Sequence, residues 1–118
     1  MLPMTNKKDT SSITLNDVEV AYGRIKDVVK KTEIDHSGSL SKLIGTEIYL
    51  KFENTQKTGS FKIRGATNKI NSLTEAEKKK GVVASSAGNH AQGVALAASK
   101  LGVKSKIVMP VNAPLIKV

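Results

Sequence analysis

Lys62 lies in a segment that could make an amine available for chemistry. Residues 58–66 read Thr-Gly-Ser-Phe-Lys-Ile-Arg-Gly-Ala, which predicts a tight turn and then a helix with Lys62 in its first turn. The partial positive charge of a helix N-terminus and the apolar neighbours Phe61 and Ile63 both disfavour the ammonium form. A neutral amine is the form that attacks a carbonyl carbon. By position alone, an ordinary surface lysine at a helix start is the commoner explanation.

Residues 85–93, Ser-Ser-Ala-Gly-Asn-His-Ala-Gln-Gly, form a second segment of chemical interest. They predict a strand that ends in a small-residue loop and continues into a helix, a place where backbone N–H groups can bind a carboxylate or a phosphate. The spacing is neither that of a Walker loop nor the dinucleotide-binding pattern, and an ordinary tight turn is the alternative. His90 by itself is more often a helix-start histidine than a catalyst. No second His, Asp or Glu stands near it at metal-ligand spacing, so we expect no metal site.

The elements around these two segments follow from apolar spacing and from stop signals. Helices are predicted over residues 14–31, 40–44, 60–73, 74–81 and 89–101. Strands are predicted over 47–52, 82–85 and 106–109, with 82–85 as a buried strand. Thr14 or Asn16 is expected to cap the first helix, and Thr74 with Glu77 has the capping-box spacing. Residues 1–12 look polar and disordered, and another helix is expected to begin at Pro114.

Composition narrows the class of protein. The 118 residues suffice for one small domain, and 39% hydrophobic with 25% charged residues is typical of a globular protein. The absence of cysteine excludes disulfides and a thiolate metal site, and no apolar run is long enough for a membrane span. No signal peptide precedes residue 14, so a cytoplasmic location without a membrane partner is expected.

The net charge of +9 is the one feature that favours a nucleic-acid partner. The densest cluster of lysines, Lys78 to Lys80, nevertheless follows two glutamates and has no interleaved aromatic residue. We therefore expect a solvated helix end there and no nucleic-acid partner.

Taken together, the two segments are more specific than either alone. Residues 51–66 and 86–93, in this order and at this separation, resemble the threonine/serine dehydratases, which belong to the tryptophan-synthase-β-like (fold type II) class of pyridoxal phosphate enzymes. The resemblance extends from about Asp17 to Val118, includes residues 72–77 and 108–114, and is strongest to the biodegradative threonine dehydratases. It implies an α/β fold, specifically an incomplete piece of the two-domain fold of these enzymes.

The resemblance also implies roles for particular residues. Lys62 would bind pyridoxal 5'-phosphate covalently and, after the substrate displaces it, remove the Cα proton. Phe61 would pack beside the cofactor ring, and Asn89 would hydrogen-bond its 3′-oxygen. The substrate carboxylate would be held by a loop of five residues: Ser86, Ala87, Gly88, Asn89 and His90. The implied reaction converts L-threonine, with L-serine as a second substrate, to a 2-oxo acid and ammonia, within threonine catabolism or isoleucine biosynthesis.

The resemblance further implies a division of the chain. Residues 1–52 would form an N-terminal segment that packs on a large domain, and residues 53–118 would begin a small domain that carries Lys62 and the carboxylate loop. The family's Gly-rich loop for the cofactor phosphate lies further along than this chain reaches, and Thr32-Glu33 stands where many relatives have Thr-Pro. We therefore expect a truncated chain that is inactive alone, and a homo-oligomeric parent enzyme.

Three alternatives stay open. The first is a serine racemase or another β-eliminating relative. The second is a basic binding module, and the third is a folded but catalytically silent gene product. Racemisation needs an acid/base on each face of the cofactor. In serine racemases that resemble this chain, a serine serves the face opposite the lysine, and the matching position here is Ala87, whose methyl group carries no proton to exchange.

Overall fold

The computed structural model describes residues 12–113, so the predictions for residues 1–11 and for a helix from Pro114 lie outside the described residues. The helices are α1 (Leu15–Ile25), α2 (Gly38–Ile44), α3 (Lys62–Asn71), α4 (Glu75–Lys80) and α5 (Asn89–Lys100). The strands are β1 (Ile34–His36), β2 (Tyr49–Lys51), β3 (Val82–Ser85) and β4 (Ser105–Val108), and two short 3-10 turns span Glu53–Thr55 and Lys57–Gly59.

The predicted α/β class is confirmed. None of the described helices is both long enough and apolar enough to span a membrane.

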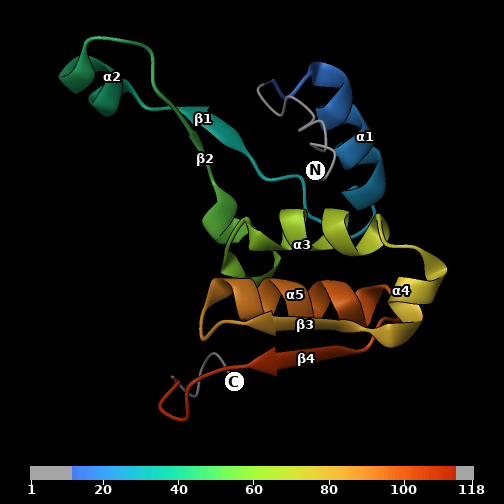
Figure 1. Ribbon diagram of the computed structural model, residues 1–118. Coiled ribbons are helices and arrows are strands. Elements are labelled where there is room, and N and C mark those ends of the chain that lie inside the picture. The colour runs from blue at the N-terminus through green and yellow to red at the C-terminus, as the bar shows by residue number, and fades with distance from the viewer. Residues whose placement is uncertain (1–11, 114–118) are drawn as a thin grey trace, which may run out of the picture.

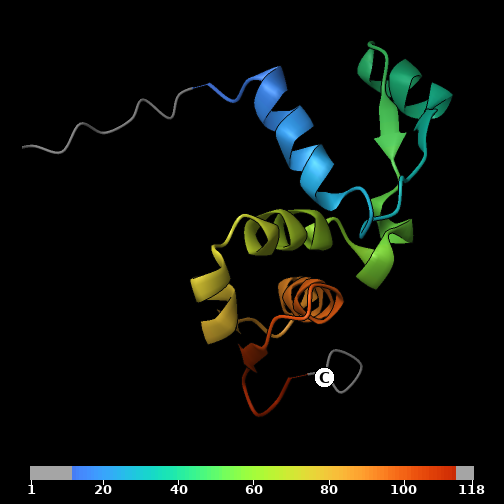
Figure 2. The same ribbon diagram turned by 90° about the vertical axis from the view of Figure 1, so that its right-hand side faces the viewer.

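The elements stack in layers above a two-stranded sheet (Figure 1). α1 lies on α3, α3 lies on α5, and α5 covers one face of the pair β3–β4. We call residues 62–108, which contain α3, α4, β3, α5 and β4, the body of the molecule. The view along α5 in Figure 2 shows this helix enclosed between α3 and the sheet. α5 is therefore the element on which the rest of the body is assembled.

Small and branched side chains form the core between α3, α5 and the sheet. Its buried residues are Ala66, Ile70, Val94, Ala97, Ala98 and Val103. Val82 and Ala84 of β3 pack against this cluster, while Val83, on the opposite face, is 73% exposed. The prediction that 82–85 is a strand is confirmed, but the prediction that it is buried is wrong, because α5 covers only one of its faces among residues 12–113.

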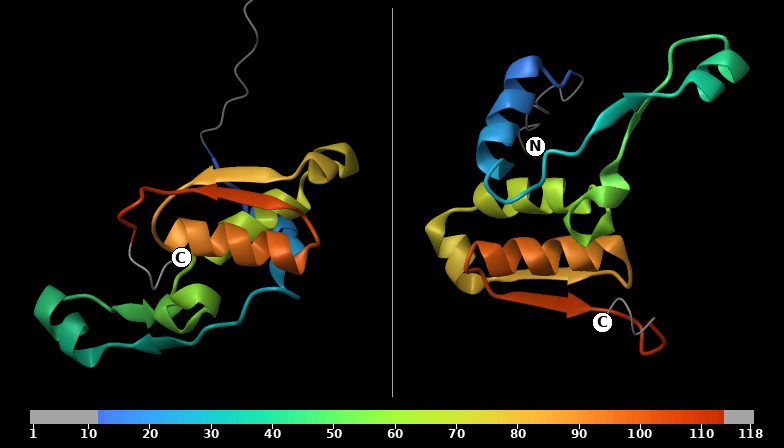
Figure 3. Two further views of the ribbon diagram at one scale, coloured as in Figure 1. Left: turned by 90° about the horizontal axis from the view of Figure 1, so that it is seen from below. Right: turned by 180° about the vertical axis from the view of Figure 1, so that it is seen from behind.

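The two strands of the body run parallel, with Val82 opposite Ser105 and Ser85 opposite Val108. The left panel of Figure 3 shows them side by side over α5, which makes the crossover between them. Gly81 ends α4 with φ +85°, and a Cβ atom there would stand 2.7 Å from the carbonyl oxygen of Lys104, so only glycine fits. This glycine lets β3 begin directly beside the residue that precedes β4.

Capping side chains set the helix starts as predicted in two places. Thr14 and Thr74 each form a capping box, with Asp17 and Glu77 respectively, so Thr14 rather than Asn16 is the first cap. The apolar stripe of α3 is confirmed for Ile63, Ala66 and Ile70 but not for Leu73, which follows the helix and is half-buried.

The predicted end of the first helix near residue 31 is wrong, because α1 ends at Ile25. The Val28 and Val29 N–H groups still donate to the Ile25 carbonyl, but at Lys30 the Gln56 side chain accepts from the backbone N–H at 2.8 Å and donates to the carbonyl at 2.7 Å. At Lys30 a side chain twenty-six residues along the chain thus replaces the helical bonds, and spacing within the segment cannot show that.

Residues 34–51 form an arm that projects from the body (Figures 1 and 2). β1 and β2 pair antiparallel, Ile34 opposite Lys51 and His36 opposite Tyr49, with α2 inserted between them. The strand predicted over 47–52 is confirmed but shorter, and β1 was not predicted, because Ile-Asp-His has no strand pattern of its own. Among the described residues, no position in the strands or the helix of the arm is buried. Its large exposed apolar side chains are Ile34, Leu40, Leu43, Ile44, Tyr49 and Leu50.

Candidate active site

Lys62 lies in the first turn of α3, as predicted, although the helix begins at Lys62 itself and not at Ser60. Its ammonium nitrogen lies 4.7 Å from the centroid of the Phe61 ring, within the range of a cation–π contact. The side chains of both residues are exposed, Phe61 to 56%. The expected desolvation of the Lys62 amine by Phe61 and Ile63 is therefore wrong among the described residues, because Ile63 points into the core and is fully buried while Phe61 lies open. The amine is reachable from solvent and has an aromatic ring beside it.

The turn before Lys62 has an unusual backbone. Thr58 has φ +64°, a left-handed value that is costly for a β-branched residue, and Gly59 follows with φ +68°. The Thr58 hydroxyl is buried and has no hydrogen-bond partner among the described residues. Ser60 is also buried, and its hydroxyl accepts from the Lys62 N–H at 3.4 Å. A strained, partly unsatisfied turn next to a candidate nucleophile is a common mark of a functional site.

A cluster of three side chains, Thr32, Glu53 and Arg64, holds this turn in place. Both oxygens of the Glu53 carboxylate accept from the Arg64 guanidinium at 2.8 Å, and one also accepts from the Thr32 hydroxyl at 2.5 Å. These bonds, led by those from Arg64, lower the pKa of Glu53 from 4.5 to about 2, and Glu53 in turn raises the pKa of Arg64. The Glu53 cluster closes the loop 53–64 and ties residue 32 to the first turn of α3. We did not predict it; the opposite charges of Glu53 and Arg64 at the two ends of one motif were the available signal.

The segment 86–90 forms the predicted loop and helix start. The Ser86 N–H donates to the Val108 carbonyl at 3.0 Å, and the Ser86 hydroxyl accepts from the Gly88 N–H at 3.2 Å. Gly88 is the N-cap of α5, and no side chain caps this helix. Ser86, Ala87 and Gly88 are half-buried, while Asn89 and His90 are exposed. The first N–H groups of a helix have no acceptor within it and carry partial positive charge, so this end of α5 can attract a carboxylate.

The two segments meet through Gly93 of α5. A Cβ atom at this position would stand 3.0 Å from both the Lys62 carbonyl carbon and the Ile63 nitrogen, which means that the two backbones touch. Asn89 lies one helical turn earlier, on the same side of α5 and about 6 Å along its axis. Lys62 and Asn89, at the helix end of the 86–90 loop, thus lie toward the same end of the α3–α5 contact. The sequence contained a signal of this contact, a glycine within an alanine-rich helix.

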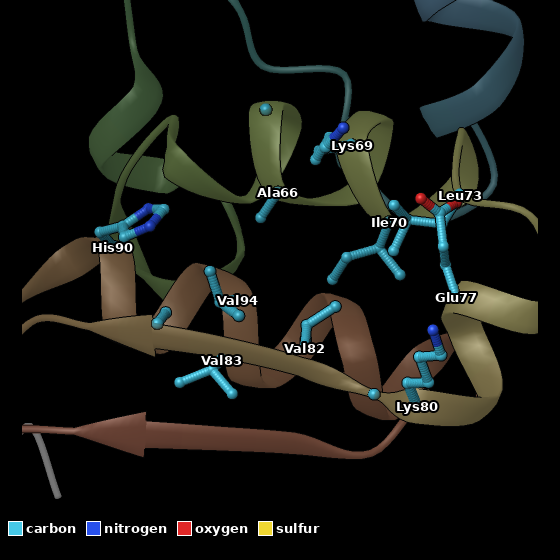
Figure 4. Close-up of a pocket in the computed structure, with 13 residues that line it drawn as sticks. Ala66, Lys69, Ile70, Leu73, Glu77, Lys80, Val82, Val83, His90 and Val94 are labelled. Carbon is cyan, nitrogen blue, oxygen red and sulfur yellow. The ribbon is translucent and has the colours of Figure 1, made fainter.

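A cavity of about 460 Å³ lies elsewhere, between α3, α4, β3 and α5 (Figure 4). Its walls are mostly apolar, with Ile70, Val82 and Val94 among them, and Lys80 and His90 lie toward opposite ends. Of the predicted site residues only His90 lines it. Besides His90 its ionisable lining residues are Lys69, Glu77 and Lys80, and neither Lys62 nor Phe61 lines it, so the cavity is separate from the surroundings of the Lys62 amine. Among residues 12–113 no three His, Asp or Glu side chains gather as metal ligands.

Comparisons with known proteins identify the family of the chain. Residues 25–118 match the family described as pyridoxal-phosphate dependent enzyme. The L-threonine ammonia-lyase of Thermotoga maritima is 60% identical over 106 residues, which are 90% of this chain and 26% of that protein. The catabolic L-threonine dehydratase TdcB of Escherichia coli is 54% identical over 106 residues, 90% of this chain and 32% of that protein. A crystal structure of serine racemase from Dictyostelium discoideum matches with a TM-score of 0.82 and 46% identity, over 89% of this chain and 34% of that one.

The chain therefore spans about a quarter to a third of the length of the curated relatives it matches. The likeness to the solved structure shows that the described α/β arrangement is part of the larger fold of these enzymes, as predicted. Because the family match runs from residue 25 to residue 118 and includes both chemical segments, the chain belongs to the family of pyridoxal-phosphate dependent enzymes.

Proposed function

We propose that the gene product carrying these residues dehydrates and deaminates L-threonine, and L-serine as a second substrate, to a 2-oxo acid and ammonia. The observation that carries the proposal is that Lys62, an exposed amine beside an aromatic ring, begins a helix whose backbone lies against Gly93, one turn after the start of α5. The names of the relatives from Thermotoga maritima and Escherichia coli support threonine as the substrate.

The residues present fit pyridoxal 5'-phosphate on two grounds. The Lys62 amine is accessible for covalent attachment, and the Phe61 ring lies next to it to cover one side of a flat heteroaromatic group. Two buried polar atoms in the two segments, the Thr58 hydroxyl and the Gln92 amide oxygen, have no partner among the described residues, as expected where further atoms complete the bonding. When bound, the cofactor supplies an electron sink that stabilises a carbanion at the substrate Cα.

Each remaining site residue has a defined task in the proposal. Lys62 would hold the cofactor through its amine, and the same amine, once the substrate has displaced it, would take the proton from the substrate Cα. Asn89 would hydrogen-bond the 3′-oxygen of the cofactor. The backbone around Ser86, Ala87, Gly88, Asn89 and His90 binds the substrate carboxylate, helped by the dipole of α5. Binding the carboxylate at a fixed point orients the Cα–H bond toward the Lys62 amine.

We further propose the division of the chain at residues 52 and 53. The uncovered apolar side chains of the arm support the idea that residues 1–52 pack on a larger domain. On this proposal the 118 residues alone are inactive, and the whole enzyme is a homo-oligomer in the cytoplasm. A role in threonine catabolism agrees with the name of the Escherichia coli relative, while isoleucine biosynthesis stays a prediction from the sequence.

A serine racemase is the second candidate, favoured by the likeness to the Dictyostelium discoideum structure. Ala87 argues against it, because racemisation needs a proton donor on the face opposite Lys62 and a methyl group provides none. Chiral chromatography of a serine reaction separates the two: we expect pyruvate with negligible D-serine, and D-serine at a rate comparable to pyruvate would favour the racemase.

Borohydride trapping tests the proposal at its centre. The protein is incubated with pyridoxal 5'-phosphate, reduced and mapped by mass spectrometry, and we expect the pyridoxyl group on Lys62. Lys57 and Lys69, which flank it in sequence, are the internal controls. Lys62→Ala should remove the label and, in the gene product, the conversion of L-threonine to 2-oxobutyrate. A label that stays mainly on Lys57 or Lys69 would show that the assignment is wrong.

A further inference from the structure

We infer that Gly93 is a positioning residue for Lys62. Because this position of α5 has no side chain, the first turn of α3 rests directly on α5, which sets where the Lys62 amine stands relative to the carboxylate loop. The inference rests on the proposed function and extends it to a residue that contacts neither substrate nor cofactor in the roles given above.

The contact at Gly93 is with backbone, not with movable side-chain ends. A Cβ atom here would lie 3.0 Å from the Ile63 nitrogen, 3.0 Å from the Lys62 carbonyl carbon and 3.2 Å from the Lys62 Cβ. No rotation of a side chain relieves contacts with a nitrogen and a carbonyl carbon. A methyl group at position 93 would therefore push the start of α3 away from α5 by a few tenths of an ångström.

Other helical glycines lack this crowding. At Gly23 in α1 and Gly65 in α3, an added Cβ would meet nothing within 4 Å among the described residues. Glycine weakens a helix interior relative to alanine, so its presence in the alanine-rich α5 needs a reason in the packing. The close approach at Gly93 is that reason.

The displacement would reach the site directly. Gly93 is one turn after Asn89 on the same side of α5, so a change in the α3–α5 spacing at this point also changes the distance between Lys62 and the 86–90 loop. Ile63 is fully buried and anchors the inward side of the turn, so a shift of this turn carries Lys62 with it. Reacting groups tolerate misplacement of only about 0.5 Å, and a shift near 1 Å costs about a hundredfold in rate.

Gly93→Ala is the test, with two matched controls. Gly23→Ala is the same substitution where space is open, and it should stabilise the chain through helix propensity. Ala97→Gly, one turn further along α5 at a fully buried position, should lower stability without adding an atom at the contact. Because Gly93→Ala is expected to destabilise, it is also made in the Gly23→Ala background, and every variant is measured in sucrose, which favours the folded state.

The readout is the ratio of borohydride-trapped pyridoxyl group on Lys62 to that on Lys57 and Lys69 of the same molecules. We expect Gly93→Ala to lower this ratio about tenfold, with the helical circular dichroism retained, while both controls keep the wild-type ratio. In the gene product, kcat should fall more than KM rises.

The outcomes separate the inference from the proposed function. If the wild-type protein carries no label on Lys62, the proposed function fails. If the wild type is labelled on Lys62 and Gly93→Ala keeps the same ratio, only the role of Gly93 is overturned. A ratio that falls equally in Ala97→Gly also overturns it, because stability alone would then explain the loss.

Discussion

The body and the arm are built from similar kinds of residues but stand in different relations to the rest of the chain. In the body, α3 and α5 share a core in which Ile70, Ala97 and Ala98 are almost fully buried. In the arm, Leu43 and Ile44 are 76% and 62% exposed although they lie on a well-formed helix. Local sequence patterns predict the helices of both regions, yet of the two only the body buries its apolar side chains within the described residues. The comparison shows that the buried apolar contacts and the candidate site lie together, at the α3–α5 contact.

Glycines at two helix ends should show the largest contrast. Gly81→Ala forces a residue with φ +85° and ψ −177° to accept a Cβ atom 2.7 Å from the Lys104 oxygen, and we expect a loss of about 4 kcal/mol in unfolding free energy. Gly45→Ala in the arm has a similar φ of +81° but open space, so its loss should be about 1 kcal/mol. Urea titrations of both variants measure the difference, and equal losses would mean that the contact with Lys104 is unimportant.

Isoleucines in the two regions give the second contrast. Ile70 is 3% exposed, and Ile70→Ala should cost about 3 kcal/mol through lost burial and a residual cavity. Ile44→Ala in the arm should change the stability of the chain by less than about 0.5 kcal/mol. Thermal unfolding followed by circular dichroism compares them. A large loss for Ile44→Ala would show that the arm is covered in solution, for example by a second copy of the chain.

Two glutamates, Glu53 beside the body and Glu47 in the arm, should differ in how much they stabilise the fold and in how that contribution changes with pH. Since the pKa of Glu53 is lowered from 4.5 to about 2, its cluster stabilises the fold fully above pH 4.5 and loses this contribution as the pH falls toward 2. We expect Glu53→Gln to cost about 2 kcal/mol at pH 7 and less than half of that at pH 3. Glu47→Gln in the arm breaks an exposed contact with His36 and should cost about 0.5 kcal/mol or less at pH 7. Urea midpoints of both variants at pH 7 and pH 3 measure these costs. A cost of Glu53→Gln that does not change with pH would contradict the role of the Glu53 charge.

Helix caps should give the smallest effects. Thr74 forms a two-way capping box at α4, with its hydroxyl accepting from the Glu77 N–H at 3.3 Å and Glu77 bonding back at 2.8 Å, so Thr74→Ala should cost about 1 kcal/mol. Ser37 caps α2 in the arm through a single bond of 3.4 Å, and Ser37→Ala should cost only about 0.3 kcal/mol. Urea titration distinguishes the two values, and a larger cost at Ser37 would reverse the expected order.

Much of the fold could be predicted because its signals are local. The caps Thr14 and Thr74, the stops at Gly45 and Gly81, and the buried stripe of α3 each depend on residues within a few positions of one another. The two chemical segments were recognisable for the same reason, since each is a short run with a specific order of residue types. These predictions needed no knowledge of which elements touch.

The predictions that failed depended on distant partners. At Lys30 the backbone bonds to the Gln56 side chain instead of continuing the first helix, and β1 is a strand because it pairs with β2. The Glu53 cluster joins residues from three places in the chain, and no spacing rule connects Thr32 with Arg64. β3 is covered on one face rather than two, a property that belongs to its neighbours and not to its own residues.

The sequence by itself determined which residues have suitable chemistry: the amine of Lys62, the small-residue loop at 86–90, and the helices that begin beside them. Only the tertiary structure decided how close they come and how exposed they are. Lys62 turned out open to solvent, and its distance from the loop is set by backbone contact at Gly93. The physical reason is that helix starts and turns follow from bonds within a few residues, whereas the spacing of two helices depends on the volume of every side chain, or its absence, between them.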